Sequence, residues 1–220
     1  MTDITLYHFP RACSRVTMTA LEEIGLDFET RPVNIWEGEQ KKPDYLAIHR
    51  MGKVPALKVG AQVRTENAAI IYSLHREYPE AGLLPSRPDG EFDEGLQDLI
   101  WCTSTMHPMT RQVRMPARYT ATDTDGVRAD GLEKYQPVLA MASKRLEGGW
   151  WYGDQWSIVD DYLMWNYSTA ANGGLDLSGH PAILDHAKRV RARPAFQRVL
   201  AREDADAKTL GIDLAPEALG

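Results

Sequence analysis

Cysteine and long apolar runs are scarce in this chain. Its two cysteines, Cys13 and Cys102, are too few for a disulfide framework. No apolar run approaches the roughly 18 residues that a membrane-spanning helix needs. Residues 1–5 lack both the basic and the apolar region of an export signal. We therefore expect a protein of the reducing cytoplasm with no membrane partner.

Signals for nucleic acids, nucleotides and metals are also missing. The 220 residues include 25 basic and 31 acidic ones, and the net charge of −6 argues against a nucleic-acid partner. The six histidines show no H-x-x-x-H spacing, and no C-x-x-C pair occurs, so no metal site is expected. No glycine-rich phosphate loop is present. The length allows one large domain or two small ones.

The first 79 residues alternate short apolar runs with helical patterns. Apolar residues recur at helical spacing up to Ile24, and Gly25 supplies a C-terminal cap. The expected elements are strand 4–7, helix 12–24, strand 28–33, helix 43–48, strand 56–59, strand 62–65 and helix 66–77. This β-α-β-α-β-β-α order is thioredoxin-like, so we predict an α/β domain with a mixed sheet over residues 1–79.

Strand signals end at that point. The prolines and glycines of residues 80–90 predict a linker, and residues 91–220 predict an all-helical domain. The expected helices cover 91–113, 126–146, 157–171, 181–193 and 194–202. Ser157 and Asp160 have the spacing of a capping box, which indicates a helix start and not a functional site.

The stretch from Gly52 to Ile70 carries the clearest functional signal. Val54-Pro55 opens the hairpin, and a bond before proline is the peptide bond that most readily becomes cis. A cis bond there would leave the main-chain N–H and C=O of Val54 to pair with an extended peptide. Glu66 and Asn67 open the next helix, and an acid at a buried strand-to-helix junction needs a partner. Together these features predict a small peptide ligand.

These residues resemble the glutathione-binding half of the soluble glutathione transferases, and the resemblance covers nearly the whole chain. The shared motifs are Val54-Pro55, Glu66-Asn67, Ser157-Ile158-Val159-Asp160 and Arg193-Pro194-Ala195-Phe196. The resemblance implies glutathione as a cosubstrate and a homodimer. It implies glutathione contacts at Lys53, Val54, Pro55, Glu66 and Asn67. The family usually has serine after the glutamate, where this chain has Asn67.

Three residues compete to activate the glutathione thiol. The string Ala12-Cys13-Ser14 resembles the beta class of bacterial transferases, which implies a reactive Cys13 assisted by His107. Ser14 could instead donate to the thiolate at the helix N-terminus, or serve as a plain cap. Tyr7 stands where other classes keep a catalytic tyrosine, or it lines the pocket. The plain reading of Cys13 is a small buried filler.

The second substrate is expected beside the fourth helix, where methionines form an adaptable apolar wall. The electrophile-site candidates are Met106, Met109, Arg111, Arg114 and Met115, with Arg118 continuing the arginine row at i, i+3 and i+7. The main expectation is a transferase that activates the glutathione thiol for attack on a small hydrophobic electrophile. One alternative is a thiol-transfer, reductase or ether-cleaving enzyme on the same site. The other is a non-catalytic glutathione-fold binding protein.

Overall fold

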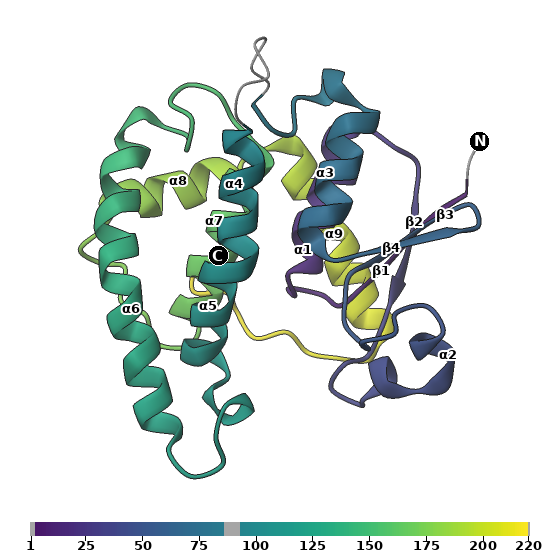
Figure 1. Cartoon of the computed structure of the whole chain (residues 1–220), viewed down its shortest axis with the longest axis horizontal. Helices are drawn as coiled ribbons and strands as arrows, with labels where there is room; N and C mark the ends of the chain where they lie inside the picture. Colours follow the sequence, from purple (N-terminus) through teal and green to yellow (C-terminus); the bar gives the residue numbers. More distant parts are fainter. Residues whose placement is uncertain (1–2, 86–92, 220) are drawn as a thin grey trace. The chain divides into compact units, whose positions relative to one another are not determined.

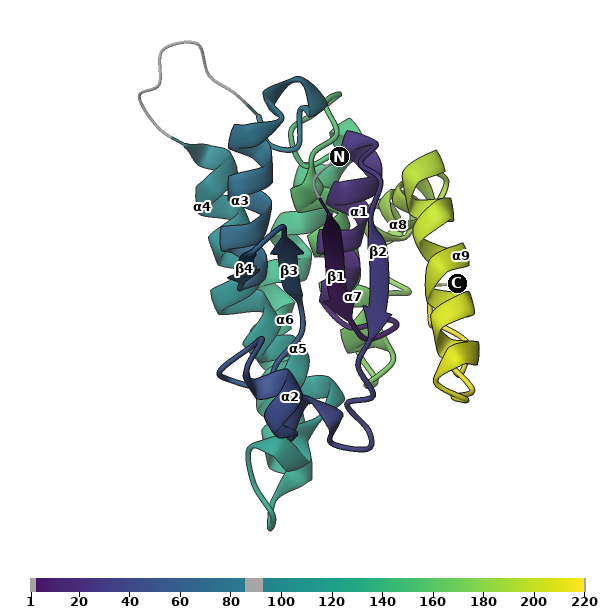
Figure 2. The same ribbon diagram turned by 90° about the vertical axis from the view of Figure 1, so that its right-hand side faces the viewer.

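A four-stranded mixed sheet organises the N-terminal part of the computed structural model, which describes residues 3–85 and 93–219. The strands lie in the order β2 (Glu29–Pro32), β1 (Ile4–His8), β3 (Ala56–Val59) and β4 (Gln62–Thr65) (Figure 2). β1 runs parallel to β2 and antiparallel to β3. β3 and β4 form the predicted hairpin. The predicted thioredoxin-like order of strands and helices is therefore confirmed.

Helices α1 (Ser14–Ile24), α3 (Asn67–Glu77) and α9 (Pro194–Thr209) accompany this sheet, with α1 packed against both of the others (Figure 1). The short α2 (Pro43–Leu46) precedes β3 in the chain. Gly25 ends α1 at φ 79°, with its N–H donating to the carbonyl of Leu21, so the predicted cap is confirmed. Leu6, Leu21 and Leu57 are fully buried in the core of this unit.

The placement of α9 differs from the domain boundaries expected from the sequence. The chain divides into two compact units, residues 1–83 with 193–215 and residues 84–192 with 216–220. The last helix therefore belongs to the thioredoxin-like unit, although residues 91–220 were expected to form one helical domain. Its Arg193 pairs with Glu23 of α1 at 2.7 and 2.8 Å, and its Phe196 is fully buried. No local pattern in α9 encodes which unit it joins.

The second unit is helical. It contains α4 (Glu94–Trp101), a π-helical turn (Cys102–Met106), α5 (His107–Arg114), α6 (Thr124–Arg145), α7 (Ile158–Ala171) and α8 (Pro181–Arg191). A Cβ on Gly131 of α6 would stand 2.8 Å from the Cβ of Gln112, so the close approach of α5 and α6 requires glycine there. The predicted capping box at Ser157 and Asp160 is present.

The segment between the units is described in part. Pro79–Ala81 forms a 3₁₀ turn where the predicted linker begins, and residues 86–90 of that linker lie outside the described residues. Within residues 3–85 and 93–219, none of the helices has the length and apolar character needed to cross a membrane.

Candidate active site

The loop between β1 and α1 brings Cys13 to the predicted peptide-binding edge. Cys13 is the N-cap residue of α1, is 8% exposed, and makes no side-chain cap. Its Sγ donates to the main-chain carbonyl of Val54 at 3.7 Å. The Val54-Pro55 bond is cis, as the sequence suggested. The structure therefore places a thiol, a helix N-terminus and a strand-like main-chain edge beside one another.

The side chain of Ser14 points into the protein, toward Phe9. It is fully buried. Its Oγ donates to the carbonyl of Phe9 and accepts from the N–H of Phe9, both at 3.3 Å. Because these two bonds occupy the hydroxyl, Ser14 holds the loop in shape.

Tyr7 lies in an apolar cluster of the sheet. Its neighbours there are Val33, Tyr45 and Ala56, and its ring meets that of Tyr45 edge-on at 5.9 Å. Successive residues of a strand point to opposite faces, so Tyr7 and its neighbour His8 face different layers. In the part of the chain that the structure describes, no hydrogen bond joins Tyr7 to the Cys13 loop.

The turn before Val54 is held by three side chains. The hydroxyl of Tyr45 donates to the carbonyl of Lys53 at 2.7 Å, and Nζ of Lys41 donates to the carbonyl of Met51 at 3.1 Å. Nδ1 of His49 accepts from the N–H of Met51 at 3.2 Å. The side chain of Lys53 is exposed, where it can meet a ligand carboxylate. Tyr45 and His49 escaped the sequence analysis because neither belongs to a motif.

Burial lowers the pKa of His49. The carboxylate of Glu66 opposes this shift, and the charges of Lys53 and Lys41 add to it. A lowered pKa keeps Nδ1 unprotonated near neutral pH, which is the state that accepts the hydrogen bond from Met51.

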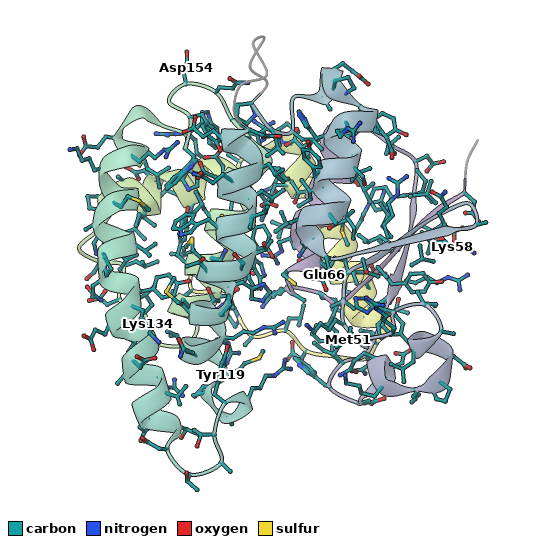
Figure 3. The ribbon with its side chains drawn as sticks, in the orientation of Figure 1. Met51, Lys58, Glu66, Tyr119, Lys134 and Asp154 are labelled. Atoms are coloured by element: carbon teal, nitrogen blue, oxygen red, sulfur yellow. The ribbon has the colours of Figure 1, made fainter. Side chains whose placement is uncertain are left out.

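Glu66 and Asn67 divide their roles at the start of α3. Glu66, labelled in Figure 3, adopts φ 70° and ψ 118°, makes no side-chain cap and is exposed, so the junction expected to be buried is buried at Asn67 but not at Glu66. Asn67 is 6% exposed. Its Oδ1 accepts from the hydroxyl of Thr17 at 2.6 Å, and its Nδ2 donates to the carbonyl of Cys13 at 3.0 Å. Asn67 thus ties the start of α3 to the Cys13 loop.

The predicted electrophile residues lie in the helical unit. Met106 and Met109 are 1% and 9% exposed, Arg111 is half-buried, and Arg114 and Met115 are exposed. The arginine row is broken, because α5 ends at Arg114 and Arg118 lies in a separate 3₁₀ turn. Nδ1 of His107 lies 3.3 Å from the hydroxyl of Tyr162, and the His107 ring packs edge-on against Trp165.

No group of three or more histidine, cysteine or acidic side chains is arranged to hold a metal ion within the described ranges. The chemistry that the first unit offers is instead that of an anion or thiolate site. Neither α1 nor α3 has a side-chain cap, and the dipole of each helix favours negative charge at its start.

Known proteins resemble this chain in both sequence and fold. Residues 2–76 match the family model "Glutathione S-transferase, N-terminal domain". The chain is 32% identical to a maleylacetoacetate isomerase of Pseudomonas aeruginosa, with 88% of this chain and 93% of that protein covered. It is 31% identical to a maleylpyruvate isomerase of a Ralstonia species, with 81% and 87% covered.

A solved structure extends the likeness to three dimensions. A glutathione transferase homologue from Sulfitobacter, determined with bound glutathione, superposes with a TM-score of 0.81 at 26% identity. The match covers 92% of this chain and 99% of that one. A thioredoxin-like unit with a cis-proline edge, a helical unit after it and relatives matched along nearly their whole length agree with one another: this enzyme belongs to the glutathione transferase family.

Proposed function

We propose that the protein binds glutathione in an extended conformation along Val54. The observation that carries this proposal is the chain of contacts that joins Val54, Cys13 and Asn67. The cysteine of the tripeptide would pair with the main chain of Val54, and its sulfur would then lie beside Cys13 and the N-terminus of α1. The relative solved with glutathione supports the ligand.

The two ends of the tripeptide have matching charges on the protein. The exposed Lys53 suits the glycine carboxylate, and the exposed Glu66 suits the ammonium of the glutamyl residue. Glu66 lies at the uncapped start of α3, where first-turn N–H groups can also take the glutamyl carboxylate (Figure 3).

The reaction we propose is attack by the glutathione thiolate on an electrophilic carbon. Lowering the thiol pKa by two units corresponds to about 2.7 kcal/mol of differential stabilisation. One or two charge-assisted hydrogen bonds and a helix dipole supply an effect of that size. Cys13 is the best placed of the three sequence candidates, because Ser14 is engaged by Phe9 and Tyr7 by the apolar cluster.

The electrophile that the relatives favour is a small unsaturated acid. Two of them are named as isomerases of maleyl compounds. A thiolate that adds to one carbon of an activated double bond leaves a single bond, about which the molecule can rotate. Loss of the thiolate then restores the double bond in the other geometry and regenerates glutathione. Arg111 and Arg114 of α5 are the candidates to hold the substrate carboxylate.

Thiol transfer is the second candidate function, and the position of the Cys13 sulfur favours it. A Cys13 thiolate could attack a glutathionyl disulfide, form a mixed disulfide and release the other thiol. A glutathione thiolate would then attack the mixed disulfide, giving oxidised glutathione and restoring Cys13. This exchange needs a sulfur beside the bound tripeptide, as the contact with Val54 provides.

Three assays on one preparation separate these reactions: isomerisation of a maleyl compound, conjugation of a chloronitrobenzene, and reduction of a small disulfide by glutathione. We expect turnover of the first two in the wild type and at least tenfold slower turnover in Cys13→Ala, because Cys13 is the side chain best placed to stabilise the thiolate. If only disulfide reduction occurs, and Cys13→Ala abolishes it, thiol transfer is the function. Absence of glutathione binding by calorimetry at millimolar concentrations would reject both candidates and leave a binding scaffold.

Homodimerisation belongs to the same proposal. β4 is an edge strand of the sheet, and its Val63 is 42% exposed. An exposed sheet edge can pack against a second copy of the chain. Light scattering of the purified protein should give twice the chain mass of 24.7 kDa. A monomer at micromolar concentration would contradict this part.

A further inference from the structure

Glu203 of α9 is buried beneath the loop that carries Cys13. Glu203 is 2% exposed, and its two carboxylate oxygens accept hydrogen bonds from different residues. Oε1 accepts from the main-chain N–H of Arg11 at 2.8 Å. Oε2 accepts from Nε of Arg15 at 2.9 Å and from a terminal nitrogen of the same guanidinium. Arg15 is 1% exposed, so the charges compensate each other in the interior.

Arg11 adopts a backbone conformation that needs support. Its φ is 62°, in the left-handed region that residues with a Cβ seldom occupy. The next residues turn directly into α1, because the N–H of Ala12 donates to Phe9 at 3.0 Å and that of Arg15 donates to Ala12 at 2.9 Å. The side chain of Arg11 also donates to the carbonyl of Ala215. The direction in which Cys13 leaves this turn therefore depends on how Arg11 is held.

We propose that Glu203 is a positioning residue for the active-site loop: by accepting the Arg11 N–H, it fixes the left-handed turn that places Cys13 beside Val54. The inference rests on the proposed function of the Cys13–Val54 edge. It assigns α9 a part in the chemistry of the N-terminal unit, although no atom of α9 need touch glutathione. Two further hydrogen bonds of the loop, Ser14 to Phe9 and Asn67 to Cys13, come from α1 and α3.

Two substitutions separate positioning from simple stabilisation. Glu203→Gln keeps an amide oxygen for the Arg11 N–H and loses the ion pair, whereas Glu203→Met loses both. We expect the kcat for isomerisation of a maleyl compound to fall at least tenfold in Glu203→Met and clearly less in Glu203→Gln. The Kd for glutathione should change less than about threefold in both variants. The same pair in an Arg15→Met background avoids an unpaired buried guanidinium and serves if the single variants do not fold.

The matched control is Glu22→Gln. Glu22 of α1 pairs with Arg198 and Arg202 of α9, so this variant also weakens the contact of the two helices, at a distance along α1 from the Cys13 loop. Its kcat should stay within twofold of the wild type. Equal losses of kcat in Glu22→Gln and Glu203→Met, or equal kcat in the Gln and Met variants of Glu203, would overturn the inference.

A readout without glutathione keeps this test independent of the proposed function. The rate at which iodoacetamide alkylates Cys13 at a fixed pH should differ from the wild-type rate in Glu203→Met and match it in Glu22→Gln. If the wild type binds no glutathione, the proposed function fails while this comparison still decides the role of Glu203. An unchanged rate of Cys13 alkylation in a folded Glu203→Met protein would reject that role.

Discussion

The starts of α1 and α7 differ in whether side chains cap the first helical turn. At α7, Ser157 accepts from the N–H of Val159, and Asp160 accepts from that of Ser157 at 2.8 Å, so the helix start is closed by its own side chains. At α1, Cys13 makes no side-chain cap. Since first-turn N–H groups need partners, a closed start stabilises the fold by itself. The start of α1 instead relies on its main chain, because the N–H groups of Arg15 and Val16 donate to the carbonyls of Ala12 and Cys13, and its helix dipole still favours a bound anion there.

Asp160 at the closed start should give the largest effect on stability. It is fully buried and also accepts from the N–H of Trp151 at 2.7 Å and from His186 at 2.9 Å, whose other nitrogen meets Tyr167. We expect Asp160→Ala to lower the free energy of unfolding by about 3 kcal/mol or more, measured by urea denaturation. Asp185→Ala, which removes an exposed ion pair with Lys188, should cost less than about 1 kcal/mol. Similar losses in both would contradict the comparison.

Cys13 at the start of α1 should instead affect activity. If it acts as a covalent relay, Cys13→Ala should reduce thiol transfer by a factor on the order of 10² or more with little change in melting temperature. The control is Cys102→Ala. Burial raises the pKa of the Cys102 thiol well above its usual value, so Cys102 stays unreactive. Mass spectrometry after treatment with oxidised glutathione should find the adduct on Cys13; an adduct only on Cys102 would remove Cys13 from the mechanism.

Glutathione bound at the starts of α1 and α3 should stabilise the folded protein. At a concentration of roughly 100 times its Kd, it should raise the free energy of unfolding by about 2.7 kcal/mol. Glu66→Ala at the start of α3 should raise the Kd several-fold and hardly change the stability of the free protein, because Glu66 is exposed. Glu77→Ala, at the other end of α3, should leave the Kd unchanged. A Kd unaffected by Glu66→Ala would remove that residue from the site.

Ser14 sharpens the comparison, because it lies beside Cys13 and yet serves the fold. Ser14→Ala leaves the buried N–H of Phe9 without its acceptor, which should cost about 1–3 kcal/mol of stability. The thiol pKa of bound glutathione, measured from the ultraviolet thiolate band, should stay at the wild-type value. A raised thiol pKa in a folded variant would show that the Ser14 hydroxyl reaches the thiolate.

His49 should give the smallest effect, through pH. Burial lowers its folded-state pKa below the ordinary value of 6.5, so below about pH 6.5 the unfolded chain binds a proton that the folded protein does not. The His49 contribution to stability is therefore complete above that pH and is lost as the pH falls toward the folded-state pKa. His49→Asn can keep an acceptor for the Met51 N–H without titrating, so the wild type should lose more stability between pH 7 and 5. Equal losses would exclude this role.

The sequence predicted the features that depend on neighbouring residues. The hairpin around Gly60, the cap at Gly25 and the capping box at Ser157 each follow from a short local pattern, and each is present. The helix starting at Asn67 follows from Glu66 and Asn67, both of which are favoured at helix starts. The family resemblance then supplied the ligand, which local patterns alone had narrowed only to a small peptide.

Features that depend on residues far apart in the chain could not be predicted from the sequence. Glu203 meets Arg11 across almost the whole sequence, and no spacing rule relates the two. The same is true of Asn67, whose amide is used by Thr17 and Cys13 in the interior. Ser14 looked available because a sequence does not show which way a hydroxyl points. The π-helical turn at Cys102–Met106 also has no signature in the residues that form it.

The membership of α9 in the first unit sets an order of events during protein synthesis. A ribosome emits β1 and α1 first, yet the helix that pairs with Glu22 and Glu23 emerges only after residues 84–192. At about 5–20 residues per second, the nascent thioredoxin-like sheet waits several seconds for its third helix, with the α1 surface that receives Phe196 still open to water. The helical unit can thus fold on the ribosome before the unit that precedes it is finished, and a nascent chain stalled before residue 193 should remain sensitive to protease within its first 83 residues.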